Sequence, residues 1–152
     1  MKQLTQFIQE KLKITKDTKI NIYNYHPKDK DELADLIEII LDENGNEADL
    51  NDIDTSEITD MSLLFYCKHF NGDISKWDVS KVENMRQMFL GSKFNGDISQ
   101  WDVSNVKDMR WMFEGSEFDG DISQWNVSNV ESMENIFRSC PLEKNPPKWY
   151  KN

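Results

Sequence analysis

Histidine, aspartate and cysteine are the side chains of this sequence that could carry chemistry, and the histidines come first. Catalysis needs a base, a nucleophile or a metal cluster, and His26 and His69 are the only imidazoles in the chain. His69 falls at a variable position of an internal repeat, shared with Lys93 and Glu117, and such positions are usually solvated surface. No glycine-rich phosphate loop, zinc-ligand spacing or nucleophile elbow is present. We therefore expect no enzyme, no catalytic residue, no cofactor and no bound metal.

Aspartate recurs at a fixed spacing of 24 residues, in two series. The first series is Asp49, Asp73, Asp97 and Asp121, and the second is Asp54, Asp78 and Asp102, followed by Asn126. Carboxylates stacked about 5 Å apart repel by about 0.8 kcal/mol per pair even in water, so something must offset the repulsion. Our preferred explanation is that each carboxylate accepts hydrogen bonds from turn N–H groups. Calcium bridging between turns is the alternative, but the spacing is not that of calcium-binding nonapeptide repeats.

The two cysteines, Cys67 and Cys140, lie three repeats apart at nearly the same repeat position. If each repeat rises by about 4.8 Å, their separation is about 15 Å, well beyond the limit of about 7 Å between Cα atoms in a disulfide. We predict two free thiols, which favours a reducing compartment.

The element that positions these residues is a 24-residue repeat. Residues 74–97 and 98–121 are identical at 16 of 24 positions without a gap, residues 122–145 continue the frame, and residues 50–73 form a degenerate first copy. Leu, Ile, Val, Met and Phe recur in register, and no single repeat could bury them alone. The spacing therefore predicts stacked turns with a continuous core.

Within each repeat we predict one strand and one short helix. The segment DISQWDV has strand-forming residues, while Val106, Met109, Met112 and Phe113 follow helical spacing. Ser80, Ser104 and Ser128 are expected as helix N-caps, with Gly91 and Gly115 at the helix ends. The predicted fold class is α/β: a leucine-rich-repeat-like solenoid of about four 24-residue strand-helix turns with a small α+β N-terminal cap.

Three regions follow from this pattern. Residues 1–47 are predicted to form an N-terminal cap: an amphipathic helix around Leu4–Leu12, a strand at 19–25, and a second helix from about Lys30 to Asp42 that Asn44-Gly45 ends. Residues 48–145 form the four repeats. Residues 146–152 form a C-terminal cap, in which Pro146 blunts the open edge and Trp149 folds over the last repeat.

Charge and hydropathy limit the classes of partner. The net charge of −10 disfavours nucleic acid and anionic lipid, both of which need clustered Lys and Arg. No apolar run is long enough to span a membrane, and the first residues lack the apolar core of a signal peptide. These features predict a cytoplasmic location without membrane insertion.

The positions that vary between repeats are the best candidates for a binding site, since stacking fixes the others. Trp77, Trp101, Trp125 and Trp149 are expected to be structural. Trp111 and Leu90 are large apolar residues where sister repeats carry polar ones, and Arg86, Arg110 and Glu114 would surround them. This composition is typical of interface hot spots. The alternative is that Trp111 packs against the N-terminal cap or is a lone exposed residue.

The repeat unit GDISxWDVSNVxxMxxMF resembles that of the BspA-like leucine-rich repeat surface proteins, known from mycoplasma lipoproteins, gut bacteria and some of their viruses. The resemblance covers residues from about 48 to 149 and rests on matches at Trp77, Asp78, Val79, Ser80, Met85, Met88 and Phe89. It implies adhesion or protein-binding roles, without enzymatic activity or cofactor. It also implies a cell-surface location, and a virus-encoded protein is a further alternative.

The function that we expect is a non-catalytic protein-protein interaction module, monomeric, with a protein partner whose identity the sequence does not give. A structural subunit of a larger assembly, such as a virus particle or surface array, is the first alternative. An acidic decoy that mimics nucleic acid is the second, although charge that alternates from segment to segment disfavours it.

Overall fold

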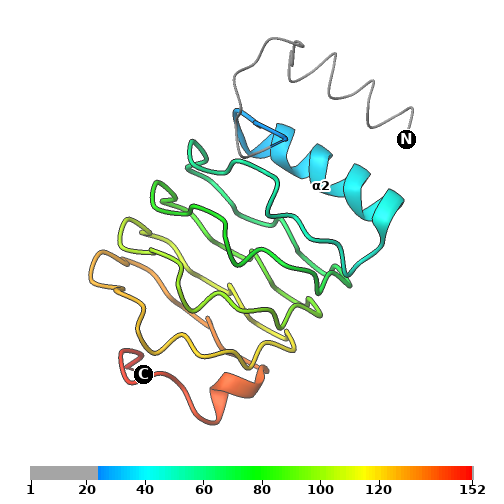
Figure 1. Ribbon diagram of the computed structural model, residues 1–152. Helices are drawn as coiled ribbons and strands as arrows, with labels where there is room; N and C mark the ends of the chain where they lie inside the picture. Colours follow the sequence, from blue (N-terminus) through cyan, green and yellow to red (C-terminus); the bar gives the residue numbers. More distant parts are fainter. Residues whose placement is uncertain (1–23, 152) are drawn as a thin grey trace.

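The computed structural model describes residues 24–151, which form a stack of four layers (Figure 1). We number the layers by the repeats: layer 1 is 50–73, layer 2 is 74–97, layer 3 is 98–121 and layer 4 is 122–145. Helix α2 (Lys30–Asn44) covers one end of the stack, and the short 3₁₀ helix η1 (Pro141–Glu143) lies at the other end with the C-terminal tail. These are the two helices of the described residues.

Helix α2 forms where the sequence predicts a helix, and its ends have clear causes. The Asp29 carboxylate caps the N-terminus by accepting the Glu32 N–H at 3.0 Å. Gly45 ends the helix at φ 83°, with its N–H donating to the Leu41 carbonyl at 2.8 Å. The apolar face is buried against layer 1 and consists of Leu33, Leu36, Ile37 and Ile40. The predicted ending at Asn44-Gly45 is confirmed.

The rest of the predicted N-terminal cap lies mostly outside the described residues. This applies to the amphipathic helix around Leu4–Leu12 and to residues 19–23 of the strand predicted at 19–25. The last residue of that strand, Tyr25, is described and pairs in parallel with Ile53 of layer 1. The division of the chain into a cap, four repeats and a C-terminal cap stays a prediction.

The predicted strand-helix solenoid is wrong, because the repeats hold neither a regular strand nor an α-helix. In an α-helix each N–H bonds to the carbonyl four residues earlier. Here alternate N–H groups of the predicted helix leave their own layer and bond to the carbonyls of the next one. The pairs are Met85 with Asp108, Gln87 with Arg110, Phe89 with Met112 and Gly91 with Glu114, at 2.8–3.0 Å.

The backbone of this segment proceeds by tight turns with a left-handed residue at every fourth position. In layer 2, Met88 N–H bonds to Met85 O and Ser92 N–H bonds to Phe89 O. The third residue of each turn has positive φ, 58° for Gln87 and 65° for Gly91, as in a type II turn. Leu63, Cys67, Trp111, Gly115, Asn135 and Ser139 repeat this geometry in the other layers. A left-handed residue at this interval excludes a helix.

The helix N-caps predicted at Ser80, Ser104 and Ser128 are therefore also wrong. Each of these serines lies in a turn, where its N–H donates to the Asp or Asn side chain two residues earlier. Gly91 and Gly115 do adopt the left-handed backbone that their glycine character suggested, but inside the turns rather than at helix ends.

The core is built from ladders of aromatic rings, one ring per layer. Phe65, Phe89, Phe113 and Phe137 stack with successive centroid distances of 5.5, 5.6 and 6.1 Å. The Trp77 and Trp101 rings are parallel at 6.5 Å, and both are 4% exposed. Each indole N–H bonds to a carbonyl of the preceding layer, as in Trp101 to Ile74 at 3.2 Å. The Trp ladder is therefore structural, as predicted.

The C-terminal tail continues this ladder past the last complete repeat. The Trp149 indole N–H donates to the Ile122 carbonyl at 2.9 Å, at the same spacing as the three earlier tryptophans. Trp149 and Tyr150 also contact the Phe137 ring, at 5.8 and 5.1 Å between centroids. The prediction that Trp149 folds over the last repeat is confirmed.

Candidate functional site

The repeated aspartates are held by the turns that they stabilise. Asp97 accepts the N–H of Ser99 at 2.9 Å, and Asp102 accepts that of Ser104 at 3.0 Å. The same bond from residue i to the N–H of i+2 recurs at Asp49, Asp54, Asp60, Asp73, Asp78, Asp108 and Asp121. The backbone hydrogen bond from Ser99 lowers the pKa of Asp97 below its ordinary value. Turn N–H groups thus offset the carboxylate repulsion, as we preferred.

Neither histidine nor cysteine gathers into a reactive cluster within residues 24–151. His26 Nδ1 lies 3.1 Å from an Asp54 oxygen, and His69 is exposed. Burial alone would raise the pKa of Asp54, but hydrogen bonds from Ser56 and His26 outweigh it and lower that pKa. Both thiols are free: Cys67 is exposed and Cys140 is buried. Over the same residues, no group of three or more His, Cys, Asp or Glu side chains could hold a metal ion.

The strongest candidate site is a surface at the tips of the left-handed turns, which we call the turn-tip face. It consists of Leu63 and Tyr66 of layer 1, Leu90 and Arg86 of layer 2, and Trp111 and Arg110 of layer 3. Backbone hydrogen bonds join these layers, from Leu63 N–H to Arg86 O at 3.1 Å and from Cys67 N–H to Leu90 O at 2.8 Å. The Gln87 N–H likewise donates to the Arg110 carbonyl at 3.0 Å and joins layer 2 to layer 3, so Leu90 and Trp111 belong to adjacent layers.

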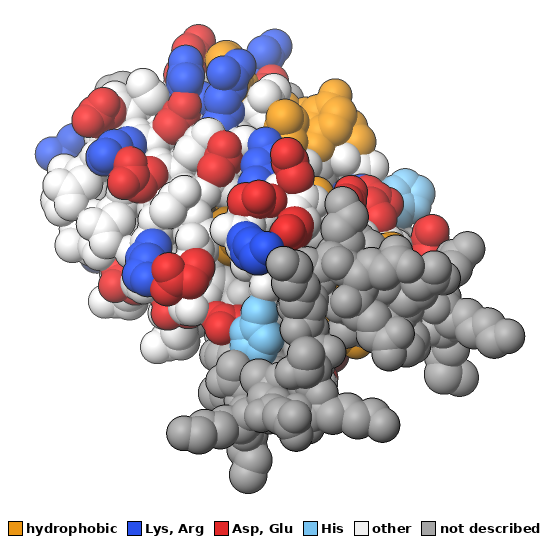
Figure 2. All heavy atoms as spheres, turned by 90° about the horizontal axis from the view of Figure 1, so that it is seen from above, with side chains coloured by type: hydrophobic (Ala, Val, Ile, Leu, Met, Phe, Trp, Pro, Cys, Tyr) orange, Lys and Arg blue, Asp and Glu red, His pale blue; other side chains and the backbone are white. Residues whose placement is uncertain are grey.

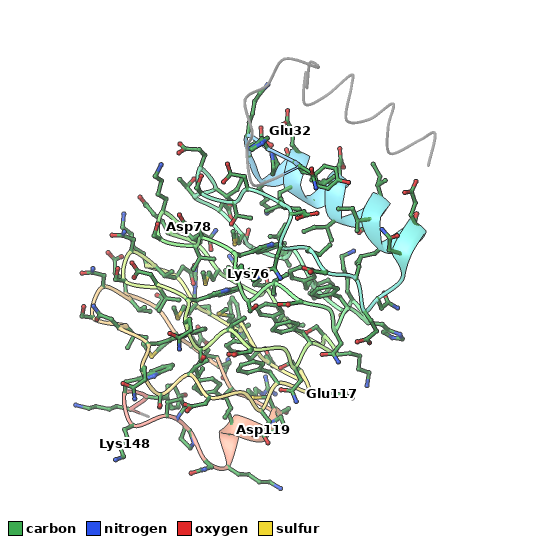
Figure 3. All side chains as sticks on the ribbon, viewed as in Figure 1. Glu32, Lys76, Asp78, Glu117, Asp119 and Lys148 are labelled. Atoms are coloured by element: carbon green, nitrogen blue, oxygen red, sulfur yellow. The ribbon has the colours of Figure 1, made fainter. Side chains whose placement is uncertain are left out.

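The turn-tip face carries the most exposed large apolar side chains of the described residues. Leu63 is 44% exposed and Tyr66 is 48% exposed. Leu90 and Trp111 are each half-buried. In the view from above, one patch of hydrophobic side chains opens to solvent with charged side chains nearby (Figure 2). Around the layers the outward side chains are otherwise mostly polar or charged, as Asp78 and Glu117 illustrate at opposite edges (Figure 3).

Trp111 is the organising side chain of this face, because two guanidinium groups contact its ring. The Arg86 carbon Cζ lies 4.9 Å from the ring centroid and that of Arg110 lies 5.6 Å from it. Each cation–π contact at a partly exposed site contributes about 0.5–1 kcal/mol. Trp111 itself has φ 55°, a conformation that costs a non-glycine residue about 1 kcal/mol or more.

The two arginines differ in their acidic neighbours. The Asp108 carboxylate holds Arg110 through Nε at 3.0 Å and Nη2 at 2.5 Å, and this hydrogen bond lowers the pKa of Asp108. Arg86 has Asn84 at the corresponding position, and the Asn84 oxygen accepts only the Arg86 backbone N–H, at 3.0 Å. Among the described residues, no carboxylate lies within 4.0 Å of the Arg86 guanidinium nitrogens, and its buried Nε has no hydrogen-bond partner.

The structure thus brings together four of the five predicted site residues, and Glu114 borders them. The Glu114 carboxylate is engaged by Arg138 of layer 4 at 3.2 Å. Leu63 and Tyr66 were missed by the sequence analysis, which treated layer 1 as degenerate. They occupy the same repeat positions as Trp111 and Leu90, so the criterion that selected those two would have found them.

A pocket lies elsewhere, between layer 4 and the C-terminal tail. Its volume is about 540 Å³, and its lining includes Asp119, Asp121, Pro146 and Lys148. Asp119 and Lys148 mark this end of the stack in Figure 3. Both prolines of the tail, Pro146 and Pro147, line the pocket together with residues of layer 4.

Across residues 24–151, no helix is both long enough and apolar enough to cross a membrane. No curated protein and no solved structure matches the chain. Residues 34–149 match the model of one protein family, which is described as Mycoplasma protein of unknown function, DUF285. That match includes most of α2, all four layers and Trp149 of the tail, well over half of the chain. The protein therefore belongs to the DUF285 family.

Proposed function

We propose that the protein is a non-catalytic binding module that holds a protein partner on the turn-tip face. The observation that carries the proposal is the combination of exposed Leu63 and Tyr66 with Trp111, whose ring contacts two arginines. Tyr, Trp and Arg are the residues most enriched at the centres of protein interfaces, whereas an isolated exposed leucine means little. A framework held by hydrogen bonds between layers keeps this surface preorganised, which reduces the entropy lost on binding.

The resemblance of the repeat to BspA-like surface proteins supports the same proposal. Such proteins use repeat arrays for adhesion and protein binding, and the matching positions in this chain are the buried or turn-forming ones, such as Trp77, Asp78 and Met85. The turn-tip positions vary between layers and are free to suit a partner.

The experiment is affinity capture from a lysate of the native cells, with three baits. The first is the wild type, and the second carries Leu63→Asn and Trp111→Asn. Layer 4 has Asn135 at this repeat position, also with positive φ, so asparagine suits the backbone there. The third bait carries Gln100→Ala and Gln124→Ala, two exposed positions on successive layers in a different turn.

The proposal predicts a partner that the wild type and the glutamine control capture in equal amounts and the asparagine variant loses. Equal thermal melts for the three baits exclude misfolding. A partner retained by the asparagine variant contradicts the proposed face. If the wild type captures nothing and instead self-associates in sedimentation, a structural subunit replaces the binding module.

A further inference from the structure

We propose that Arg86 gives the turn-tip face its specificity, by pairing with one Asp or Glu side chain of the partner. An apolar side chain beside that carboxylate would pack on Leu63 and Tyr66. The inference deepens the proposed function and rests on it, since it names the chemistry of the partner at the same face.

The first argument is a comparison of two neighbouring layers with nearly the same sequence. Layer 3 reads Asp108-Met109-Arg110, and layer 2 reads Asn84-Met85-Arg86. In layer 3 the aspartate both accepts the turn N–H and neutralises the arginine. In layer 2 the asparagine keeps the turn, with its oxygen 3.0 Å from the Arg86 N–H, but supplies no charge. Because layer 2 has asparagine where layer 3 has aspartate, Arg86 lacks the ion pair that Asp108 makes with Arg110.

The second argument is that Arg86 is nevertheless held in a defined orientation. Its guanidinium lies over the Trp111 ring at 4.9 Å, and the side chain is half-buried. Its backbone is fixed by the Asn84 turn and by the Leu63 N–H, which donates to the Arg86 carbonyl. An oriented guanidinium loses little freedom when it pairs, and its planar donors match a carboxylate. Arg86 is thus oriented for an ion pair that no carboxylate of the described residues makes with it within 4.0 Å.

The third argument concerns the other charges near this face. Arg110 is neutralised by Asp108, and Glu114 is engaged by Arg138. These pairs leave Arg86 as the cation of the face without a carboxylate partner within 4.0 Å, among the described residues. Asp108 also interacts electrostatically with Arg86, but its carboxylate is bonded to Arg110. A partner carboxylate that approaches the Trp111 ring would therefore meet, beside exposed apolar surface, a guanidinium that has no ion pair of its own.

The net charge of −10 restricts the partner further. An acidic stretch would be repelled by the whole molecule, whereas a single carboxylate beside Arg86 interacts at contact distance. Screening over about 8 Å at physiological ionic strength weakens the distant repulsion much more than the contact. The partner segment should therefore carry one acidic residue, an adjacent apolar residue and otherwise neutral or basic side chains.

The test uses a phage library of random dodecapeptides, selected on the immobilised wild type and, in parallel, on the Leu63→Asn, Trp111→Asn variant. Peptides enriched only by the wild type are synthesised, and their affinities are measured by fluorescence anisotropy. The key variant is Asn84→Asp, which gives layer 2 the carboxylate of layer 3 and should neutralise Arg86 internally. Arg86→Gln removes the cation, and Asn126→Asp is the control, since it adds a carboxylate to a turn that is aspartate in layers 2 and 3.

We expect the selected peptides to contain one Asp or Glu next to an apolar residue. Asn84→Asp and Arg86→Gln should each weaken binding about tenfold or more, and Asn126→Asp should leave it unchanged. Replacing the acidic residue of the peptide by its amide should weaken binding to the wild type by a similar factor. The same replacement should hardly change binding to the Arg86→Gln variant. Circular dichroism confirms that each variant folds.

Two results would overturn the inference. The first result is that the selected peptides contain no acidic residue, or that Asn84→Asp and Arg86→Gln leave their affinity unchanged. The turn-tip face would then still be a binding surface, but pairing of a partner carboxylate with Arg86 would be excluded. The second result is that the wild type enriches no peptides beyond those that the Leu63→Asn, Trp111→Asn variant enriches. This result would exclude a site on the turn-tip face that binds a short peptide through its carboxylate. The affinity capture from the lysate then tests independently whether the turn-tip face binds a protein partner.

Discussion

Two tryptophans of layer 3 show how position in the repeat decides the role of a residue. Trp101 is buried and its indole N–H satisfies the Ile74 carbonyl, whereas Trp111 is half-buried and contacts two arginines through its ring. Fixed recurrence at 24 residues predicted the first role from the sequence. The surface role of Trp111 was indicated by the variation between repeats at its position. Its left-handed backbone could not be predicted, because tryptophan does not favour that conformation.

Replacing each of these tryptophans by phenylalanine should separate the two roles. Trp101→Phe removes one of the two donors to the buried Ile74 carbonyl, which keeps the Trp77 backbone N–H at 3.2 Å, and opens space in the core. We therefore expect a loss of about 2 kcal/mol in the free energy of unfolding. Trp111→Phe keeps a ring under both arginines and breaks no indole hydrogen bond seen in the structure. We expect its cost to stay below about 0.5 kcal/mol. Urea denaturation measures both, and equal losses would contradict the assignment.

At the scale of the element, the repeat length and stacking could be predicted, and the local backbone could not. Met85, Met88 and Phe89 are buried at spacings of three and four residues, which an amphipathic helix shares with these successive turns. The deciding feature is the left-handed backbone of Gln87, a residue that does not signal it. Gly91 did signal such a conformation, but one glycine fits a helix end as well as a turn.

Two glycines of the layers should respond differently to alanine. A Cβ at Gly72 would lie 1.9 Å from the Ala48 carbonyl oxygen, so Gly72→Ala must push two backbone segments apart. We expect a loss of about 3 kcal/mol in unfolding free energy, at the upper end of overpacking costs. A Cβ at Gly115 would meet nothing within 4 Å and would add only the strain of φ +64°, about 1 kcal/mol. Thermal melts compare the two, and a more stable Gly72→Ala variant would refute this packing.

For the whole molecule, the sequence predicted the continuous core, the helix that ends it and the tryptophan that closes it. It also predicted the role of the aspartates, because their repetition demanded a partner in every layer. The turn-tip face was predicted only in part, since layer 1 departs most from the repeat and yet carries Leu63 and Tyr66. A surface that spans three layers is apparent only when the stacking is known.

The aspartates also give the whole stack a dependence on pH. Hydrogen bonds from Ser75, Ser99, Ser104 and Ser123 lower the pKa values of Asp73, Asp97, Asp102 and Asp121. A carboxyl group with a lowered folded-state pKa contributes stability above its unfolded value, about 3.9, and loses it as the pH falls through the folded value. We expect the unfolding free energy to be constant near neutral pH and to decrease below about pH 4.

Urea denaturation at a series of pH values measures this decrease. Asn126 shows that asparagine can take the same turn, with its oxygen 3.2 Å from the Ser128 N–H. The variant Asp97→Asn, Asp121→Asn should therefore keep the turns and show a shallower loss of stability in acid. If the unfolding free energy of this variant fell with pH as steeply as that of the wild type, other carboxylates would be responsible for the pH dependence.

Hydrogen exchange of the complex tests the central claim, that the turn-tip face is the binding surface, most directly. The protein is compared alone and with its captured partner or a selected peptide, and exchange is followed by mass spectrometry. We predict added protection in the segments 61–68, 85–92 and 109–116, which carry the face, and no change in 74–80 or 98–104. Protection confined to those latter segments, or to the C-terminal tail, would contradict the account.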